Sequence, residues 1–151
     1  MASSLRLVSC IVVVATILAG AEAETYTVLD SLGWTIPPGG QIAYRVWADK
    51  QDFMIGDTLV FNWTGDHTVA RVPQSDYDNC TANNVIGSIQ KTSPTNFTID
   101  SNVTYFICTI ENHCKLGQKV KISVGASAPS LITSALTTVL FALAISFFSH
   151  V

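Results

Sequence analysis

The chain has 151 residues, a formal net charge of −3 and 13% charged residues. This length indicates a single domain. A mildly acidic chain has no electrostatic attraction to nucleic acid or to anionic lipid surfaces, so neither is an expected partner.

Residues 1–23 have the pattern of a secretory signal peptide. Arg6 precedes an apolar run over residues 10–18, and Ala21-Glu22-Ala23 provides small residues for a cleavage site. The apolar run is too short for a membrane-spanning helix. We therefore expect export from the cell and a mature domain over residues 24–124.

Short alternations of apolar and polar residues, separated by turn-forming residues, fill this domain. They predict β-strands over residues 26–29, 42–46, 58–63, 96–99, 105–108 and 119–124. A helical turn is expected over residues 75–81, with Ser75 or Asp76 as its cap. Many short strands at this spacing favour an all-β sandwich or barrel.

The end of the chain predicts a membrane anchor. After Lys121 there is no Asp, Glu, Lys or Arg. A short linker with small residues at its start (125–135) leads to an apolar tail (136–151), as in a GPI-attachment signal whose tail is removed. A transmembrane helix is the alternative, but it usually has Lys or Arg on its cytoplasmic side. We expect a GPI-anchored protein on the extracellular side of the plasma membrane.

Asparagine sequons and cysteines are informative in an exported protein. The N-x-S/T sequons, which are expected glycosylation sites, start at Asn62, Asn79, Asn96 and Asn102. Of the four cysteines, Cys10 lies in the signal peptide, so the mature chain keeps Cys80, Cys108 and Cys114. Two of these would normally form a disulfide, which leaves one thiol. That thiol could pair between chains, stay buried and inert, or bind a metal.

A metal site is indicated by the donors near the last strand. Cys108, His113 and Gln118 follow one another within one loop, and His67 is the only other histidine of the mature domain. Two imidazoles, a thiolate and a weak axial donor describe a blue-copper electron-transfer site. Zinc also binds Cys and His, so spacing alone leaves the metal open.

The adjacency of His113 and Cys114 bears on which cysteine is the ligand. Neighbouring side chains diverge in extended backbone. If His113 faces the metal, Cys114 is free to pair with Cys80, and Cys108 is the thiolate. That pairing would leave zinc only three of the four N or S ligands of a structural site.

Several longer motifs accompany these donors. They are Leu32-Gly33-Trp34, Trp47-Ala48-Asp49-Lys50, residues 53–61, His67-Thr68-Val69, residues 77–80, and residues 105–108 with His113-Cys114 and residues 117–120. Together they resemble the phytocyanins, the plant blue-copper family, and most closely its stellacyanin-like and mavicyanin-like members. The resemblance extends from Tyr26 to Val124.

This resemblance implies a cupredoxin-like Greek-key β-sandwich with a Cys80–Cys114 disulfide. It also implies one type 1 copper ion, with the ligands His67, Cys108, His113 and Gln118. Many relatives have Met at the axial position, whereas stellacyanin-like members have Gln. Thr68 replaces the commoner Asn, so the hydrogen bonds around the ligands are expected to differ.

The leading functional hypothesis is a monomeric one-electron carrier, and not an enzyme, at the extracellular face of the plasma membrane. Its redox partner is not identified by the sequence. The alternative is a cell-surface binding, signalling or cell-wall interaction module in which copper redox activity is secondary. An oxidase-like enzyme is disfavoured, since it would need further copper centres that two histidines cannot supply.

Overall fold

The computed structural model describes residues 22–125. The predicted signal sequence up to residue 21 and the predicted linker and tail from residue 126 lie outside the described residues. Within residues 22–125, no helix is long and apolar enough to cross a membrane.

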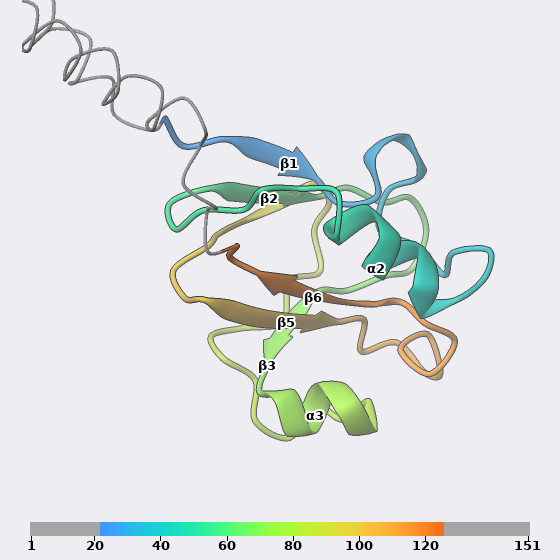
Figure 1. Ribbon diagram of the computed structural model, residues 1–151. Helices are drawn as coiled ribbons and strands as arrows, with labels where there is room; N and C mark the ends of the chain where they lie inside the picture. Colours follow the sequence, from blue (N-terminus) through green and yellow to red (C-terminus); the bar gives the residue numbers. More distant parts are fainter. Residues whose placement is uncertain (1–21, 126–151) are drawn as a thin grey trace, which may run out of the picture.

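Two three-stranded sheets form the domain. The first has the order β1 (Thr25–Thr27), β2 (Thr58–Phe61) and β4 (Thr95–Thr98), with β1 parallel and β4 antiparallel to β2. The second has the antiparallel order β3 (Ala70–Val72), β5 (Val103–Ile107) and β6 (Lys119–Ser123). Figure 1 shows the two sheets facing each other, which is the predicted sandwich.

Alternating side chains explain why these segments form a two-layer structure. On β6, Val120 and Ile122 are buried while Lys121 is exposed, and on β2 Leu59 and Phe61 are buried. Since successive side chains of a strand point to opposite faces, each sheet presents an apolar face to the other.

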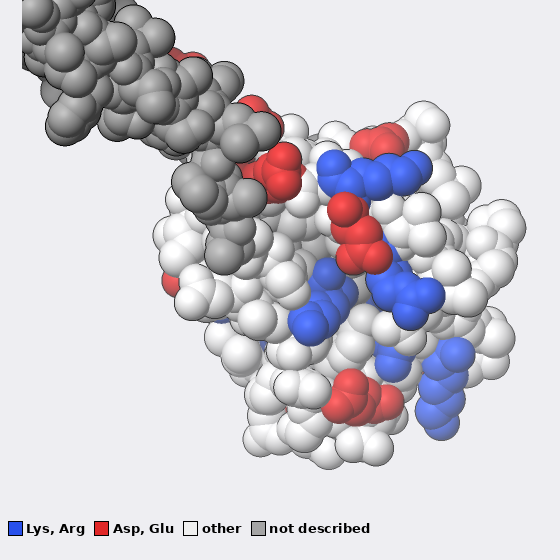
Figure 2. All heavy atoms as spheres, viewed as in Figure 1, with Lys and Arg blue, Asp and Glu red and all other residues white. Residues whose placement is uncertain are grey.

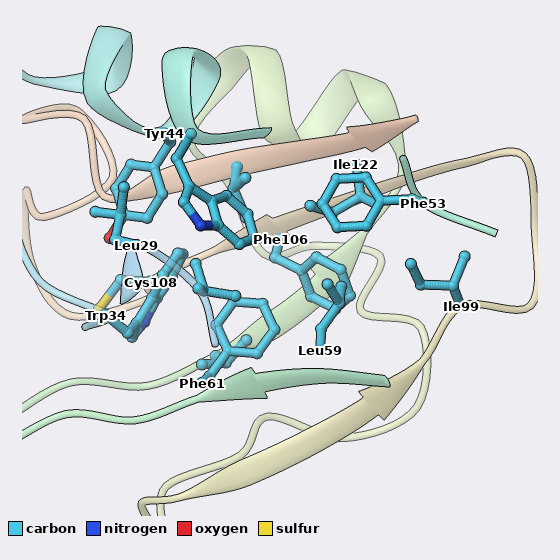
Figure 3. Close-up of a cluster of buried hydrophobic side chains, with 14 residues drawn as sticks. Leu29, Trp34, Tyr44, Phe53, Leu59, Phe61, Ile99, Phe106, Cys108 and Ile122 are labelled. Carbon is cyan, nitrogen blue, oxygen red and sulfur yellow. The ribbon is translucent and has the colours of Figure 1, made fainter. Parts of the chain in front are cut away.

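An aromatic cluster fills the space between the sheets. Phe61 contacts Trp34, Phe97 and Phe106 with ring centroids 5.0, 5.6 and 4.9 Å apart. Burying one such side chain contributes roughly 1.5–3 kcal/mol to stability. Figure 3 shows Cys108 at one end of this cluster, beside Trp34. The core therefore ends at the thiol that the sequence marks as a metal ligand.

The predicted strand over residues 42–46 is wrong, because these residues lie in helix α2 (Gln41–Ala48). The alternation of Ile42, Tyr44 and Val46 resembles a strand, but Ile42 and Val46 are 59% and 46% exposed. The buried residues are Tyr44 and Trp47, three positions apart, as on one face of a helix.

The predicted helical turn is confirmed as α3 (Gln74–Asn79), but its predicted cap is wrong. Pro73 occupies the N-cap position, and no side chain caps the helix there. Asp76 instead lies inside the first turn, where its carboxylate accepts hydrogen bonds from the Thr81 hydroxyl (2.9 Å) and the Asn84 N–H (2.7 Å). A short 3₁₀ turn, η1 (Asp30–Leu32), completes the regular elements of the described residues.

Candidate metal centre

Three strands bring the predicted donors to one end of the sandwich. Cys108 directly follows β5, Gln118 directly precedes β6, and His67 lies shortly before β3. Donor atoms of His67, Cys108 and His113 all lie within 4.8 Å of one another. The His113 Nδ1 atom is 3.2 Å from the His67 Nδ1 atom and 3.6 Å from the Cys108 Sγ atom. Residues far apart in the sequence thus form one compact group of a sulfur donor and two imidazole donors.

Backbone hydrogen bonds close the loop between Cys108 and Gln118. The Cys108 N–H donates to the Gln118 carbonyl (3.1 Å), and the Gln118 N–H donates to the His113 carbonyl (2.9 Å). The first and last predicted ligands of the loop are therefore joined directly. This bonding fixes the spacing of the donors without any contribution from a metal.

The disulfide anchors the same loop to the end of helix α3. Cys80, at the end of α3, is bonded to Cys114, as predicted. Cys108 is the free cysteine of the described residues, and it is buried. His113 and Cys114 thus diverge as expected for neighbouring residues, because His113 is directed to the donor group while Cys114 is bonded to Cys80.

Gly117 holds this loop against the start of α2, a role that the sequence analysis missed. Its φ is +101°, and a Cβ atom there would lie 2.3 Å from the Gln41 nitrogen and 2.6 Å from the Gly40 carbonyl carbon. Only glycine fits such a close backbone approach. Its position immediately before Gln118 was the available signal, but the partner segment is distant in sequence.

Thr68 links the His67 segment to the Cys108 segment. Its N–H donates to the Cys108 Sγ atom at 3.5 Å, and its Oγ1 atom accepts from the Thr109 N–H at 2.9 Å. The Trp34 indole N–H in turn donates to the Thr68 carbonyl at 2.8 Å. The side chain at this position therefore bonds the backbone after Cys108, as expected for a group that orients a ligand.

The buried side-chain amide of Gln118 shows whether these residues fit a metal. Its side chain is 0% exposed, and both its Oε1 and Nε2 atoms lack a hydrogen-bond partner. Buried amides are almost always hydrogen-bonded, so an unpaired one needs an explanation. A metal ion bound beside it would give the amide oxygen a partner. The combination of this oxygen with two imidazoles and a thiolate fits copper.

The electrostatics of the site favour a neutral imidazole at His67. Burial, and next the proximity of His113, lowers the pKa of His67. The Gln118 amide and the Asp66 carboxylate act in the opposite direction, although the Gln118 contact does not reach hydrogen-bond geometry. Because metal ligation requires the deprotonated imidazole, a lowered pKa prepares His67 for binding.

Burial divides the donors into an inner and an outer pair. Cys108 and Gln118 are buried, whereas His67 and His113 are only half-buried. The imidazoles are therefore the donors closest to solvent.

The predicted glycosylation sites lie on the surface of the domain. The asparagines of the sequons, Asn62, Asn79, Asn96 and Asn102, are all exposed.

Comparisons with known proteins agree with this geometry. The plastocyanin-like domain family matches residues 34–118. A blue copper protein of Pisum sativum is 40% identical over 133 residues, which cover 86% of this chain and 68% of the relative. Stellacyanin of Toxicodendron vernicifluum is 39% identical over 101 residues, covering 66% of this chain and 94% of the relative.

Solved structures give the same answer for the fold. Cucumber stellacyanin with Cu²⁺ at pH 7.0 superimposes with a TM-score of 0.60 at 32% identity, covering 71% of this chain and 99% of that chain. The cucumber basic protein, a blue copper protein, has a TM-score of 0.57 at 26% identity and covers 67% of this chain and 99% of that chain. The predicted cupredoxin-like fold is confirmed. The chain belongs to the phytocyanins, the plastocyanin-like blue-copper proteins, and its cofactor is one type 1 copper ion.

Proposed function

We propose that this protein is a one-electron carrier rather than an enzyme, and that it acts at the extracellular face of the plasma membrane. In this proposal His67, Cys108, His113 and Gln118 are the copper ligands. The buried, unpaired Gln118 amide beside the donor cluster is the observation that supports the proposal most strongly.

Copper, when bound, supplies exchange of one electron between Cu(II) and Cu(I). The chain contributes a loop whose donors are already held by backbone hydrogen bonds and by the Cys80–Cys114 disulfide. A donor set that moves little between oxidation states keeps the reorganisation of electron transfer small. With four protein donors, no ligand position is left over for a substrate.

The half-buried imidazoles provide the route for the electron. His67 and His113 are the outer donors, while the thiol is closed off by Trp34 and Thr68. A redox partner would therefore approach on the side of the histidines. The partner itself is defined only as a one-electron donor or acceptor.

Stopped-flow spectroscopy of the copper-loaded protein tests this function. Ascorbate should bleach the oxidised protein and ferricyanide should restore it, with one electron per protein over many cycles. The site variant His113→Ala should lose this cycle, and Lys91→Ala, an exposed residue away from the donors, should retain it. Turnover of an organic substrate with oxygen uptake beyond that of free copper would contradict the proposal.

The proposed location rests on different observations. The Cys80–Cys114 disulfide is of a kind formed in oxidising compartments, and all four sequon asparagines are exposed for glycosylation. The predicted signal peptide and the predicted GPI signal support the same location. Expression of the full chain in plant cells, followed by phosphatidylinositol-specific phospholipase C, should release it from the membrane. Retention after this treatment would favour the transmembrane alternative.

A second candidate function is a surface binding module, favoured by a cleft between α2 and β6. The cleft has a volume of about 350 Å³ and is lined by three of the eight Lys and Arg residues of the chain, Arg45, Lys119 and Lys121. Figure 2 shows several basic side chains on this face, with acidic side chains among them, and Asp49 also lines the cleft. The size is that of a small-ligand site, and the charges suit a carboxylated carbohydrate.

Calorimetric titration with a galacturonic acid pentamer tests this second function. Binding should weaken at least tenfold in Arg45→Ala/Lys121→Ala, while Lys91→Ala, an exposed lysine outside the cleft, should bind as the wild type does. A neutral galactose pentamer that binds equally well would exclude the charge-based reading.

A further inference from the structure

Asp57 is a buried carboxylate that has no part in the metal centre. It is 1% exposed and lies in the turn before β2. Its Oδ1 atom accepts a hydrogen bond from the Glu24 backbone nitrogen (2.8 Å), and its Oδ2 atom accepts from the Met54 N–H (2.7 Å). Both donors are neutral amides. Among the described residues the single salt bridge joins Arg71 and Asp100, so Asp57 is buried without a cationic side chain.

Further carboxylates lie near the Tyr26 hydroxyl, two residues after Glu24. The Tyr26 hydroxyl donates to the Glu24 carboxylate at 2.8 Å. Burial raises the pKa of Tyr26 to about 12, with additional effects from the Glu24 hydrogen bond and from the charges of Glu24, Asp57 and Asp52. Negative charge is thus concentrated around strand β1, whose first contact is the bond from the Glu24 nitrogen to Asp57. A buried carboxylate is costly unless a positive charge compensates for it.

We propose that cleavage after Ala23 converts the Glu24 nitrogen into an α-ammonium group, which then forms an ion pair with the Asp57 carboxylate. Hydrolysis of the Ala23–Glu24 peptide bond adds water, leaving a carboxylate on Ala23 and an amine on Glu24 that is protonated at neutral pH. The neutral amide donor of the precursor becomes an α-ammonium group 2.8 Å from the Asp57 Oδ1 atom. The inference rests on the predicted cleavage site and on export, and it does not depend on the electron-carrier function.

This ion pair would fasten the first strand to the sheet. Strand β1 has only three residues and lies at the edge of its sheet, parallel to β2 (Figure 1). The Thr58 N–H donates to the Glu24 carbonyl at 2.8 Å, so Glu24 contacts the start of β2 on both sides of its own Cα atom. A charge-assisted bond here is stronger than the amide bond that it replaces. Signal-peptide removal would therefore stabilise the mature domain relative to its precursor.

The test compares two N-termini in the full chain. The precursor is expressed through a secretory pathway, and the copper-loaded, detergent-solubilised product is compared with one that has a serine inserted between Ala23 and Glu24. In the inserted chain the ammonium lies one residue away, and Glu24 retains an amide N–H. Mass spectrometry establishes each N-terminus, and circular dichroism gives each melting temperature.

We expect the wild-type product to begin at Glu24 and the inserted chain to melt roughly 5 °C lower, the shift expected for about 1 kcal/mol in a domain of this size. The insertion should have little effect in an Asp57→Asn background. It should keep its full effect in Asp52→Asn, which removes an exposed neighbouring carboxylate that does not bond this nitrogen.

A pH series provides a second readout that does not require Asp57→Asn to fold. The titratable groups near this end of β1 are the Asp57 carboxylate, which contacts the nitrogen, and the Tyr26 hydroxyl with the Glu24 and Asp52 carboxylates near it. Pairing with a carboxylate raises the pKa of an ammonium group. The stability difference between the two chains should thus be complete below about pH 7.5 and disappear at higher pH, as the folded ammonium deprotonates.

Equal melting temperatures for the two chains, or an insertion effect that is the same at pH 6 and pH 11, would overturn the ion pair. A wild-type product that begins at a residue other than Glu24 would overturn the cleavage assignment. Neither result bears on copper binding, which the absorption of the same samples reports separately.

Discussion

Two buried polar side chains of this domain differ in whether their polar atoms are hydrogen-bonded. Asp76, in α3, is 4% exposed and accepts hydrogen bonds from Thr81 and Asn84. Gln118, beside the donor cluster, is 0% exposed, and neither polar atom of its side chain has a hydrogen-bond partner in the described chain. Burial of a polar group without a partner is unfavourable, so it persists where another requirement outweighs it. The Asp76 carboxylate is satisfied within the fold, whereas the Gln118 amide oxygen is open, as the proposed axial ligand requires.

The surroundings of the two residues explain this difference. The Asp76 carboxylate accepts hydrogen bonds from residues that lie within eight positions of it along the chain. Gln118 is held by its backbone to His113 and Cys108, which leaves its side chain beside the donor cluster. Backbone hydrogen bonds thus position a side chain whose own polar atoms have no partner in the described chain.

Gly117→Ala should have the largest effect on this arrangement. The substitution costs about 1–3 kcal/mol in backbone strain alone, and its Cβ would also lie 2.3 Å from the Gln41 nitrogen. Urea unfolding should show this loss together with weaker copper binding. Gly87→Ala is the matched control, because its φ is +85° with no atom within 4 Å of the added Cβ. Equal losses in the two variants would show that the close approach does not matter.

Gln118→Leu should separate stability from metal binding. The leucine removes two unpaired polar atoms, so the copper-free protein should gain about 1–2 kcal/mol in its free energy of unfolding. Copper affinity should fall at the same time. Urea unfolding of the copper-free protein, with competitive chelator titration, measures both. A destabilised copper-free variant would mean that the amide has a structural partner after all.

Gln118→Met should change the reduction potential without removing a donor. An amide oxygen is a harder donor than a thioether sulfur and favours Cu(II) over Cu(I). Cyclic voltammetry should therefore give a lower potential for the wild type than for the variant. An equal or higher wild-type potential would count against Gln118 as an axial ligand.

Asp76→Asn should have the smallest effect and should depend on pH. The hydrogen bond from the Asn84 N–H, followed by that from Thr81, holds the pKa of Asp76 below its usual range. A lowered folded pKa contributes stability that is present above the unfolded value, about pH 4, and is lost as pH falls through the folded value. Thermal melts at pH 7 should separate the wild type from the variant, and melts at pH 2 should not. A difference that is unchanged at pH 2 would contradict this origin.

Local chemistry in the sequence was enough to predict the free thiol and the gathering of two histidines around it. The counting of cysteines isolated one thiol, and the adjacency of His113 and Cys114 indicated which one it is. The alternation of buried residues also located β2 and β6 to within two residues.

Non-local geometry could not be predicted in the same way. The exposure of Ile42 and Val46 depends on how α2 packs against β6, so their alternation was misleading. Gly117 matters because of Gly40 and Gln41, which are distant in sequence. Such approaches are set by the packing of whole elements, which local periodicity does not report.

Absorption spectroscopy of the copper-loaded protein tests the central claim most directly. Cys108, the proposed thiolate ligand, is buried beside the imidazoles of His67 and His113. The wild type should show an intense thiolate-to-Cu(II) band in the red, and Cys108→Ser should lose it. Persistence of the band in Cys108→Ser would contradict the assignment of the ligand and of the site.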